Sequence, residues 1–261
     1  MRTVSWLPPE WHDTVGSTNV VAAADPRPGR VVVAAHQSAG RGRRGRDWTA
    51  PPGTALAVSA VVPAPPARLL GWTPLVAGLA VTRVLAAGPA PVPARVKWPN
   101  DVVVVDPGPQ GAAATRGGKV CGVLAQVVEA PGGSQVVVVG TGLNVSQSAP
   151  ELPVPTATSW LLARGRALPE GVRERFLSAY LDGLAVLLER LVTDPAGVRR
   201  EYRAHCETLG RRVRIELPGG AQRTGTAVDV AEDGALLLRG DDGTVLAHHA
   251  GDVVHVRPPL G

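Results

Sequence analysis

Four extended segments crowd into the stretch between residues 95 and 141, and this crowding restricts the folds that the chain can adopt. They are Arg95–Trp98, Val102–Val105, Lys119–Val128 and Gln135–Thr141, and their β-branched content is typical of strands. Helical segments lie before and after this group and do not alternate with its strands. We therefore predict an α+β fold in which helices flank a mixed sheet.

Further elements surround this group. One predicted strand alternates so that Leu56, Val58 and Ala60 share a face. Residues 1–15 are predicted to form an irregular arm, and residues 106–116 a mobile hairpin insert rich in Gly, Ala and Pro. The other predicted strands are Val31–Gln37 and Thr54–Val62, and the predicted helices are Val20–Ala24, Leu69–Ala87, Glu170–Val192 and about Gly197–Cys206.

The pattern of the chain changes at about Gly210. Short β-rich segments follow one another and are separated by the turn sequences Pro218-Gly219-Gly220, Glu232-Asp233-Gly234 and Asp241-Asp242-Gly243. Regular strands with such turns predict a small all-β barrel of roughly 50 residues. We therefore divide the chain into a main domain, residues 1–208, and a β domain, residues 209–261.

The charge of the chain is unevenly distributed. The formal net charge of the 261 residues is +5, and Arg41–Asp47, with four arginines and one aspartate, supplies +3 of it. Charge held in one loop is not the extended basic face of a nucleic-acid-binding protein. Two cysteines do not make a disulfide framework. No signal peptide stands out, and the apolar runs are interrupted short of a membrane span, so we predict a cytoplasmic protein.

The glycine–arginine loop, residues 38–47, contains Gly40–Gly45, which matches the spacing GxGxxG but lacks the context of a dinucleotide site. The prolines after Asp47 prevent a helix from opening there, and no acidic residue lies between Asp47 and Asp101 to bind a ribose. A P-loop is excluded because Val120 follows Lys119. Two interpretations of the loop remain open. It is either a loop that orders around a carboxylate or phosphate, or a solvated basic loop.

Lysine is almost absent from the chain. Lys97 and Lys119 are the only two, against 25 arginines. The lysine ammonium is a compact point charge, whereas the arginine guanidinium is a rigid planar fork. Each lysine therefore suits a tight site that holds carboxylate or phosphate oxygens.

Five motifs in order resemble those of the biotin–protein ligase family and cover about residues 16–146. They are Gly16–Asn19 (GSTN), His36–Trp48 (HQSAGRGRRGRDW), Val96–Asp101 (VKWPND), Gly118–Leu124 (GKVCGVL) and Gly140–Val145 (GTGLNV). The resemblance implies a class II synthetase-like catalytic core in residues 1–208. It also implies that the β domain, residues 209–261, is an SH3-like barrel.

The resemblance implies a two-step reaction. Biotin and ATP, the latter with Mg²⁺, form biotinyl-5′-adenylate and pyrophosphate. The biotinyl group then passes to one lysine of a biotin carboxyl carrier domain of an acyl-CoA carboxylase. The residues fit this chemistry, because two anions must be brought together and the loop arginines and Lys119 offset their repulsion. A loop that closes over the mixed anhydride would exclude water.

The resemblance also implies the site residues. Lys119, Arg41 and Asp101 are the predicted catalytic residues, and Asp101 is hypothesised to help deprotonate the acceptor lysine. No residue is predicted to bind a metal. The other predicted contacts are Ser17, Thr18, Asn19, Gln37, Gly42 and Arg43 for biotin and adenylate, and Trp48, Asn100 and Asn144 for the nucleotide.

Structural roles for these residues and other functions stay open. Ser17, Thr18 or Asn19 can cap a helix, and Trp48 can pack in the core. A lipoate–protein ligase or octanoyltransferase of the same superfamily is one alternative, and a nucleic-acid-binding module is a remote one. Because about 15 residues precede the Ser-Thr-Asn motif, we expect no N-terminal DNA-binding domain and no binding to DNA. We expect a monomer or weak homodimer with no membrane association.

Overall fold

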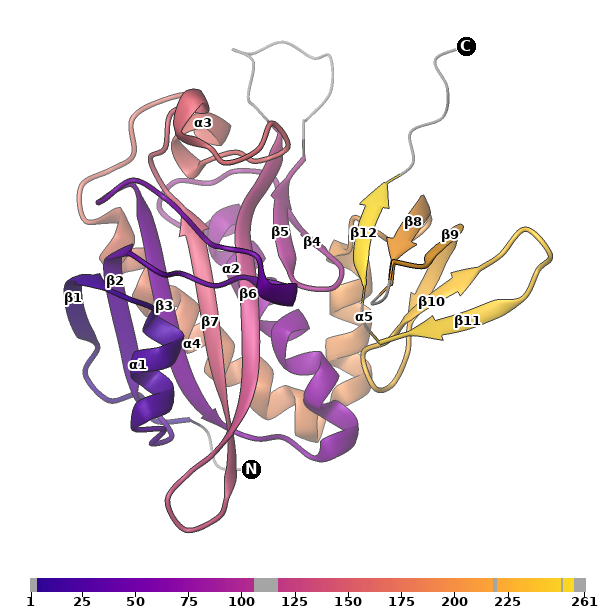
Figure 1. Cartoon of the computed structure of the whole chain (residues 1–261), viewed down its shortest axis with the longest axis horizontal. Coiled ribbons are helices and arrows are strands. Elements are labelled where there is room, and N and C mark those ends of the chain that lie inside the picture. The colour runs from indigo at the N-terminus through magenta and orange to yellow at the C-terminus, as the bar shows by residue number, and fades with distance from the viewer. Residues whose placement is uncertain (1–3, 106–116, 218–219, 250, 256–261) are drawn as a thin grey trace.

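The computed structural model describes residues 4–105, 117–217, 220–249 and 251–255. A large sheet with helices on both faces forms the main body, and a smaller sheet lies beside it (Figure 1). The predicted insert 106–116, two residues of a predicted turn, Pro218 and Gly219, and Val256, the last residue of a strand predicted at Val253–Val256, lie outside the described residues.

The main sheet has seven strands in the order β1-β2-β3-β7-β6-β5-β4. β1 and β2 pair in parallel, whereas all other neighbours pair antiparallel, so the predicted mixed sheet is confirmed. The strands are β1 (Glu10–Val15), β2 (Val31–Gln37), β3 (Ala55–Pro63), β4 (Ala94–Lys97), β5 (Asp101–Val104), β6 (Gly118–Glu129) and β7 (Gln135–Asn144).

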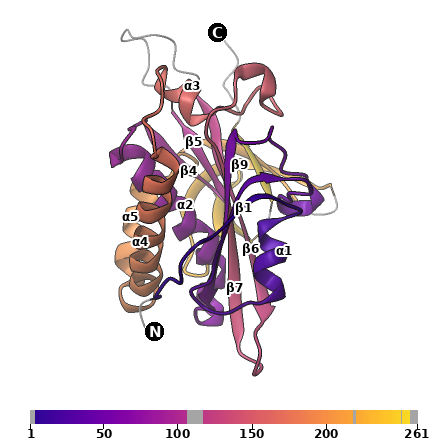
Figure 2. The ribbon, with the colours of Figure 1, turned by 90° about the vertical axis from the view of Figure 1, so that its left-hand side faces the viewer.

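Helices cover the two faces of this sheet unequally (Figure 2). α2 (Thr73–Ala87), α4 (Val172–Thr193) and α5 (Pro195–His205) pack on one face, and α1 (Thr18–Ala24) packs against β2, β3 and β7 on the other. The apolar positions of α4 recur at helical spacing, and they are buried as predicted. These positions are Phe176, Tyr180, Leu184, Leu187, Leu188 and Leu191.

Strand β3 shows why the two faces differ. Leu56, Val58 and Ala60 belong to the large core under α2 and α4, which confirms the predicted alternation. Ala57 and Ser59 alternate with them and therefore point to the face that carries α1. Small side chains on that face leave room above the sheet.

Two local predictions were wrong, and one helix was missed. Residues 10–15 form strand β1 rather than part of an irregular arm, because this exposed edge strand pairs through its backbone and needs no apolar alternation. The helix predicted to begin at Leu69 starts as a 3-10 turn, Ala67–Trp72, and becomes α-helical at Thr73. The short helix α3 (Trp160–Arg164), capped by the Ser159 hydroxyl, was not predicted.

The helical stretch Ala67–Ala87 is long and apolar enough to cross a membrane, contrary to the prediction that every apolar run falls short. In the fold, 72% of its most apolar window is buried. This is the burial expected of a helix that packs against a sheet.

The smaller sheet has five antiparallel strands in the order β11-β10-β9-β8-β12, as expected for the SH3-like domain. It docks on the main body through two buried tryptophans. The indole of Trp98 donates to Gly234 O (3.0 Å), and that of Trp72 donates to Glu232 O (3.1 Å). The strands are β8 (Arg212–Glu216), β9 (Gln222–Val230), β10 (Leu236–Arg239), β11 (Val245–His248) and β12 (Asp252–His255).

We expect Trp98→Phe to lower the free energy of unfolding by about 1–3 kcal/mol, because it leaves the Gly234 carbonyl without its buried donor. Denaturant unfolding measures the change. Trp11→Phe is the matched control, since this side chain is exposed and its loss should cost less than about 0.5 kcal/mol. Equal effects of the two substitutions would contradict the proposed docking contact.

Burial, and next the charges of Lys97 and Arg211, lowers the pKa of His255 from 6.5 to about 4. Above pH 6.5 the imidazole is neutral in both states. Between pH 6.5 and 4 the unfolded chain binds the proton more readily, so we expect thermal stability to fall as the pH drops through this window. His255→Gln should flatten this dependence. If the pH dependence of thermal stability is the same in His255→Gln as in the unmodified protein, His255 is not the group responsible.

Candidate functional site

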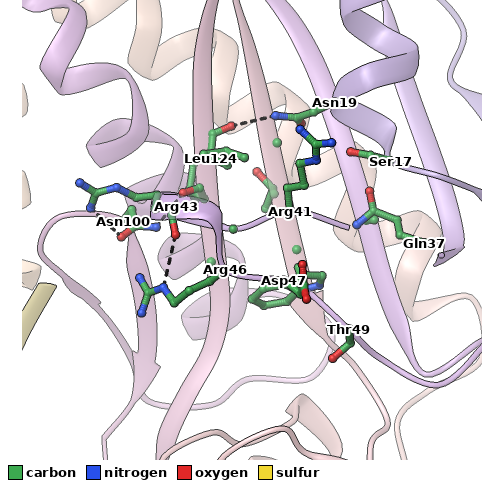
Figure 3. A pocket seen from close by; sticks show the side chains of 18 of the residues that line it. Ser17, Asn19, Gln37, Arg41, Arg43, Arg46, Asp47, Thr49, Asn100 and Leu124 are labelled. Carbon is green, nitrogen blue, oxygen red and sulfur yellow. Dashed lines mark hydrogen bonds between the residues drawn. The ribbon is translucent and has the colours of Figure 1, made fainter. Parts of the chain in front are cut away.

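A cavity of about 210 Å³ lies on the α1 face of the main sheet, under the glycine–arginine loop (Figure 3). Every predicted site residue except Asp101 lines it, although these residues come from distant parts of the sequence. They are Ser17, Thr18, Asn19, Gln37, Arg41, Gly42, Arg43, Trp48, Asn100, Lys119 and Asn144.

The floor of the cavity consists of small residues on neighbouring strands. A Cβ on Gly142 would lie 2.5 Å from Cε2 of Trp48, and one on Gly140 would lie 2.1 Å from Oδ1 of Asn19. Glycine at both positions therefore lets these side chains lie directly on the sheet. Two cross-strand rows form the floor: Ala57, Gly142 and Gly122 in one, and Ser59, Gly140 and Leu124 in the next.

One end of the cavity is a neutral polar network. Gln37 Oε1 accepts hydrogen bonds from the backbone N–H (2.8 Å) and the hydroxyl (3.0 Å) of Thr18. The Thr18 hydroxyl is also 2.8 Å from the buried hydroxyl of Ser59. Ser17 occupies the N-cap position of α1, but its side chain makes no capping bond. The Ser17 hydroxyl is thus available to a ligand.

The side chain of Asn19 is held by the protein on every side. Its Oδ1 lies 2.6 Å from the Ser59 hydroxyl, and its Nδ2 donates to Leu124 O (3.3 Å) and to Gln126 Oε1 (2.8 Å). The amide is therefore fixed in orientation at the wall of the cavity.

The glycine–arginine loop forms the other wall as a narrow hairpin. Gly42 N donates to Arg46 O (2.6 Å), and Trp48 N donates to Gly40 O (2.9 Å). Arg41 and Arg43 both line the cavity, and Arg41 points toward the part of it that Ser17 and Asn19 line (Figure 3). The loop thus presents guanidinium groups to the interior.

Arg43 is tied to the turn between β4 and β5. Its Nη1 donates to Oδ1 of Asn100 (3.1 Å), and Nδ2 of Asn100 donates to Val123 O (2.8 Å). Burial lowers the pKa of the Arg43 guanidinium, while the charges of Asp252 and Asp101 oppose that shift. Asn100 therefore connects the loop to strand β6.

Lys119 Nζ lies 2.7 Å from Asp101 Oδ1 and 5.5 Å from the centroid of the Trp48 ring. The β5–β6 ladder is irregular between Val102 and Val103, next to this pair. Bulges re-aim side chains near functional sites, and this one lies where Asp101 and Lys119 meet. Asp101 thus lies outside the cavity lining but contacts its main cation.

The second lysine, Lys97, lies near Asp101 and Lys119. Burial lowers the pKa of Lys97, with Asp101 opposing the shift and Lys119 adding to it. Asn144, which lines the cavity, is itself buried: its Nδ2 donates to Thr158 O (3.0 Å) and its Oδ1 accepts from Gln147 (3.1 Å). Asn144 thereby joins β7 to the segment before α3.

Part of the site carries no recognisable pattern in the sequence and was not predicted. Ser59 lies within a predicted strand and belongs to no motif. The one feature of the sequence that could have indicated it is the alternation of the strand, which places Ser59 on the face opposite to that of Leu56 and Val58. Residues 153–157 complete the cavity wall because Lys119 N donates to Thr156 O (2.9 Å). No local pattern marks this segment, since it reaches the cavity only through contact with β6.

Known proteins match most of the chain. Residues 14–144 match the Biotin/lipoate A/B protein ligase family, and residues 208–256 match the Biotin protein ligase C terminal domain. The biotin–[acetyl-CoA-carboxylase] ligase of Mycobacterium tuberculosis is 41% identical over 93% of this chain and 86% of its own length. The enzyme of the same name from Paracoccus denitrificans is 34% identical over 81% of this chain and 85% of its own length.

The fold matches as well. The structure of the biotin protein ligase from Aquifex aeolicus in complex with biotin and ATP has a TM-score of 0.76 at 25% identity. The match covers 96% of this chain and 99% of the Aquifex chain. Sequence and fold agree over both sheets, and the chain belongs to the biotin–protein ligase family.

Proposed function

We propose that this protein is an ATP-dependent biotin–[acetyl-CoA-carboxylase] ligase that forms biotinyl-5′-adenylate and transfers the biotinyl group to a carrier lysine. One observation supports it most directly. A single cavity joins a neutral polar end, built by α1, Gln37 and Ser59, to a cationic end, built by the loop and Lys119.

We propose that the polar end holds the ureido ring of biotin. The hydroxyls of Ser17 and Thr18 and the amide of Gln37 provide both donors and acceptors there. Asn19, already bonded to Ser59, orients this wall. An apolar acyl tail would offer no hydrogen-bond partner to the Ser17 hydroxyl or to the N–H groups of the Gln37 amide, which favours biotin over lipoate or octanoate.

We propose that the cationic end performs the adenylation. A carboxylate oxygen of biotin attacks the α-phosphorus of ATP, the acyl–phosphate bond forms, and pyrophosphate leaves. Lys119, Arg41 and Arg43 stabilise the charge that gathers on the oxygens in the transition state. Gly42 lets the loop backbone approach the phosphate. Trp48, Asn100 and Asn144 are proposed to place the nucleoside beside this reaction.

The metal is proposed to enter with the nucleotide. Among residues 4–105, 117–217, 220–249 and 251–255, no three His, Cys, Asp or Glu side chains gather in a metal-binding group. Mg²⁺ commonly binds through substrate phosphates with one or two carboxylates and keeps several waters. MgATP is thus the substrate, and Asp47 is a carboxylate that lines the cavity.

The second step needs a neutral acceptor amine. The carrier lysine attacks the acyl carbonyl, an amide bond forms, AMP leaves and one proton is released. We propose that Asp101, placed against Lys119, takes this proton. We also propose that residues 1–208 carry the chemistry and that residues 209–261 form the SH3-like cap that contacts the loop.

In the first experiment, the purified protein is incubated with biotin, MgATP and a biotin carboxyl carrier domain, and the intact mass of the carrier is measured. We expect one added biotinyl group. Lys119→Ala should lower the rate about 100- to 1,000-fold, the effect of removing one preorganised donor. Lys119→Arg should restore little, because the planar fork differs in shape.

Arg27→Ala, at an exposed ion pair far from the cavity, is the control and should keep the normal rate. If the carrier is labelled with lipoate but not with biotin, the activity is that of a lipoate–protein ligase of the same superfamily. Salt-sensitive RNA binding without any carrier labelling would contradict the proposed function.

For Asp101→Asn we expect a slower transfer of preformed biotinyl-5′-adenylate to the carrier, by roughly 100-fold or more, because a general base is removed. Single-turnover mixing measures this step alone. The variant rate should rise steadily with pH toward the ordinary lysine pKa of about 10.4, as solvent deprotonates the acceptor. A normal transfer rate at neutral pH would show that Asp101 is not the base.

A further inference from the structure

The four arginines of residues 41–46 differ in their neighbours. Arg41, Arg43 and Arg46 line the cavity, whereas Arg44 does not belong to its lining. Arg44 and Arg46 reach across to the small C-terminal sheet, where both meet the carboxylate of Asp252. One residue of the second sheet thus holds half of the charge of the loop.

Asp252 is well placed for this contact. It begins β12 and pairs with Glu216 at the end of β8, so two adjacent strand ends face the loop. Its Oδ2 lies 3.3 Å from Arg44 Nη1, and its Oδ1 lies 2.9 Å from Arg46 Nη2. Its side chain is only 25% exposed. Arg44 also donates to Glu216 O (3.0 Å) and to Leu217 O (3.1 Å).

The backbone of Arg44 gives independent support for a held conformation. Its φ is +58°, and among the described residues it is the only non-glycine residue with a positive φ. This left-handed conformation is unfavourable for a residue with a Cβ and persists where the surroundings fix it. The side-chain contacts of Arg44 with β8 and β12 are those surroundings. The shape of the loop therefore depends on the C-terminal sheet.

On the basis of the proposed function, we infer that Asp252 is a positioning residue that keeps the loop closed over the cavity. By pairing with Arg44 and Arg46, it fixes the loop backbone that presents Arg41 and Arg43 to the cavity. Closure retains biotinyl-5′-adenylate and excludes water until the carrier lysine attacks. Loss of this contact leaves adenylation possible but lets the adenylate escape and hydrolyse in solution to biotin and AMP.

The test compares Asp252→Asn with Asp241→Asn. Asp241 lies in the turn between β10 and β11 of the C-terminal sheet and also pairs with an arginine, Arg212, which is not part of the glycine–arginine loop. One reaction is divided by ultrafiltration to measure free biotinyl-5′-adenylate and biotinylated carrier. We expect the ratio of free adenylate to labelled carrier to rise roughly tenfold in Asp252→Asn, the effect of one lost charge-assisted contact, and to stay unchanged in Asp241→Asn.

Further variants separate positioning from general stability. Asp252→Glu should restore much of the normal ratio, and Arg44→Ala should raise the ratio without adding to the effect of Asp252→Asn. Thermal unfolding of all variants shows whether the C-terminal sheet has remained folded. An unchanged ratio in a folded Asp252→Asn, or the same rise in Asp241→Asn, overturns the inference.

Limited trypsin digestion tests the same contact without the reaction. Trypsin cleaves after arginine, and cleavage within residues 41–46 requires the loop to open. We expect faster cleavage there in Asp252→Asn than in Asp241→Asn or the unmodified protein. If the protein makes no adenylate but trypsin cleaves the loop faster in Asp252→Asn, the proposed function is wrong while the contact between Asp252 and the loop is supported. Equal cleavage rates overturn the contact whatever the activity.

Discussion

Positive charges that gather around one cavity repel one another, and the site depends on how the fold relieves this repulsion. Lys119 lies against Asp101, and Arg43 donates to Asn100. Arg44 and Arg46 share the carboxylate of Asp252, which belongs to the other sheet. Each partner holds its cation in one orientation. Donors that are oriented before the substrates arrive need no reorganisation during the reaction, which is the usual source of electrostatic catalysis.

The cavity exists because the central ladder of the main sheet places small residues side by side. The β3–β7 and β6–β7 registers align Ala57, Gly142 and Gly122 in one row. A shift of one residue would turn these small residues to the opposite face and replace them with valines and leucines. Asn19 and Trp48 lie directly on glycines of this floor, so register and site are set together.

Much of the fold and of the site could be predicted from the sequence. The central strands and the long helix α4 carry strong periodic patterns, and the predicted motifs meet in one cavity. Strand β1 was missed because an exposed edge strand pairs through its backbone, whatever its side chains. Residues 153–157 were missed because they reach the cavity through a backbone bond from Lys119, which leaves no local pattern.

The sequence by itself determined which chemical groups are present. It placed lysine at only two positions, concentrated arginine in one loop, and left glycines in the Gly-Thr-Gly segment of β7. Only the tertiary structure decided the neighbours of each group, because contacts between distant segments depend on strand register and on the docking of the two sheets. The contact of Arg44 and Arg46 with Asp252 is such a case, since Arg46 and its partner lie 206 positions apart in the sequence.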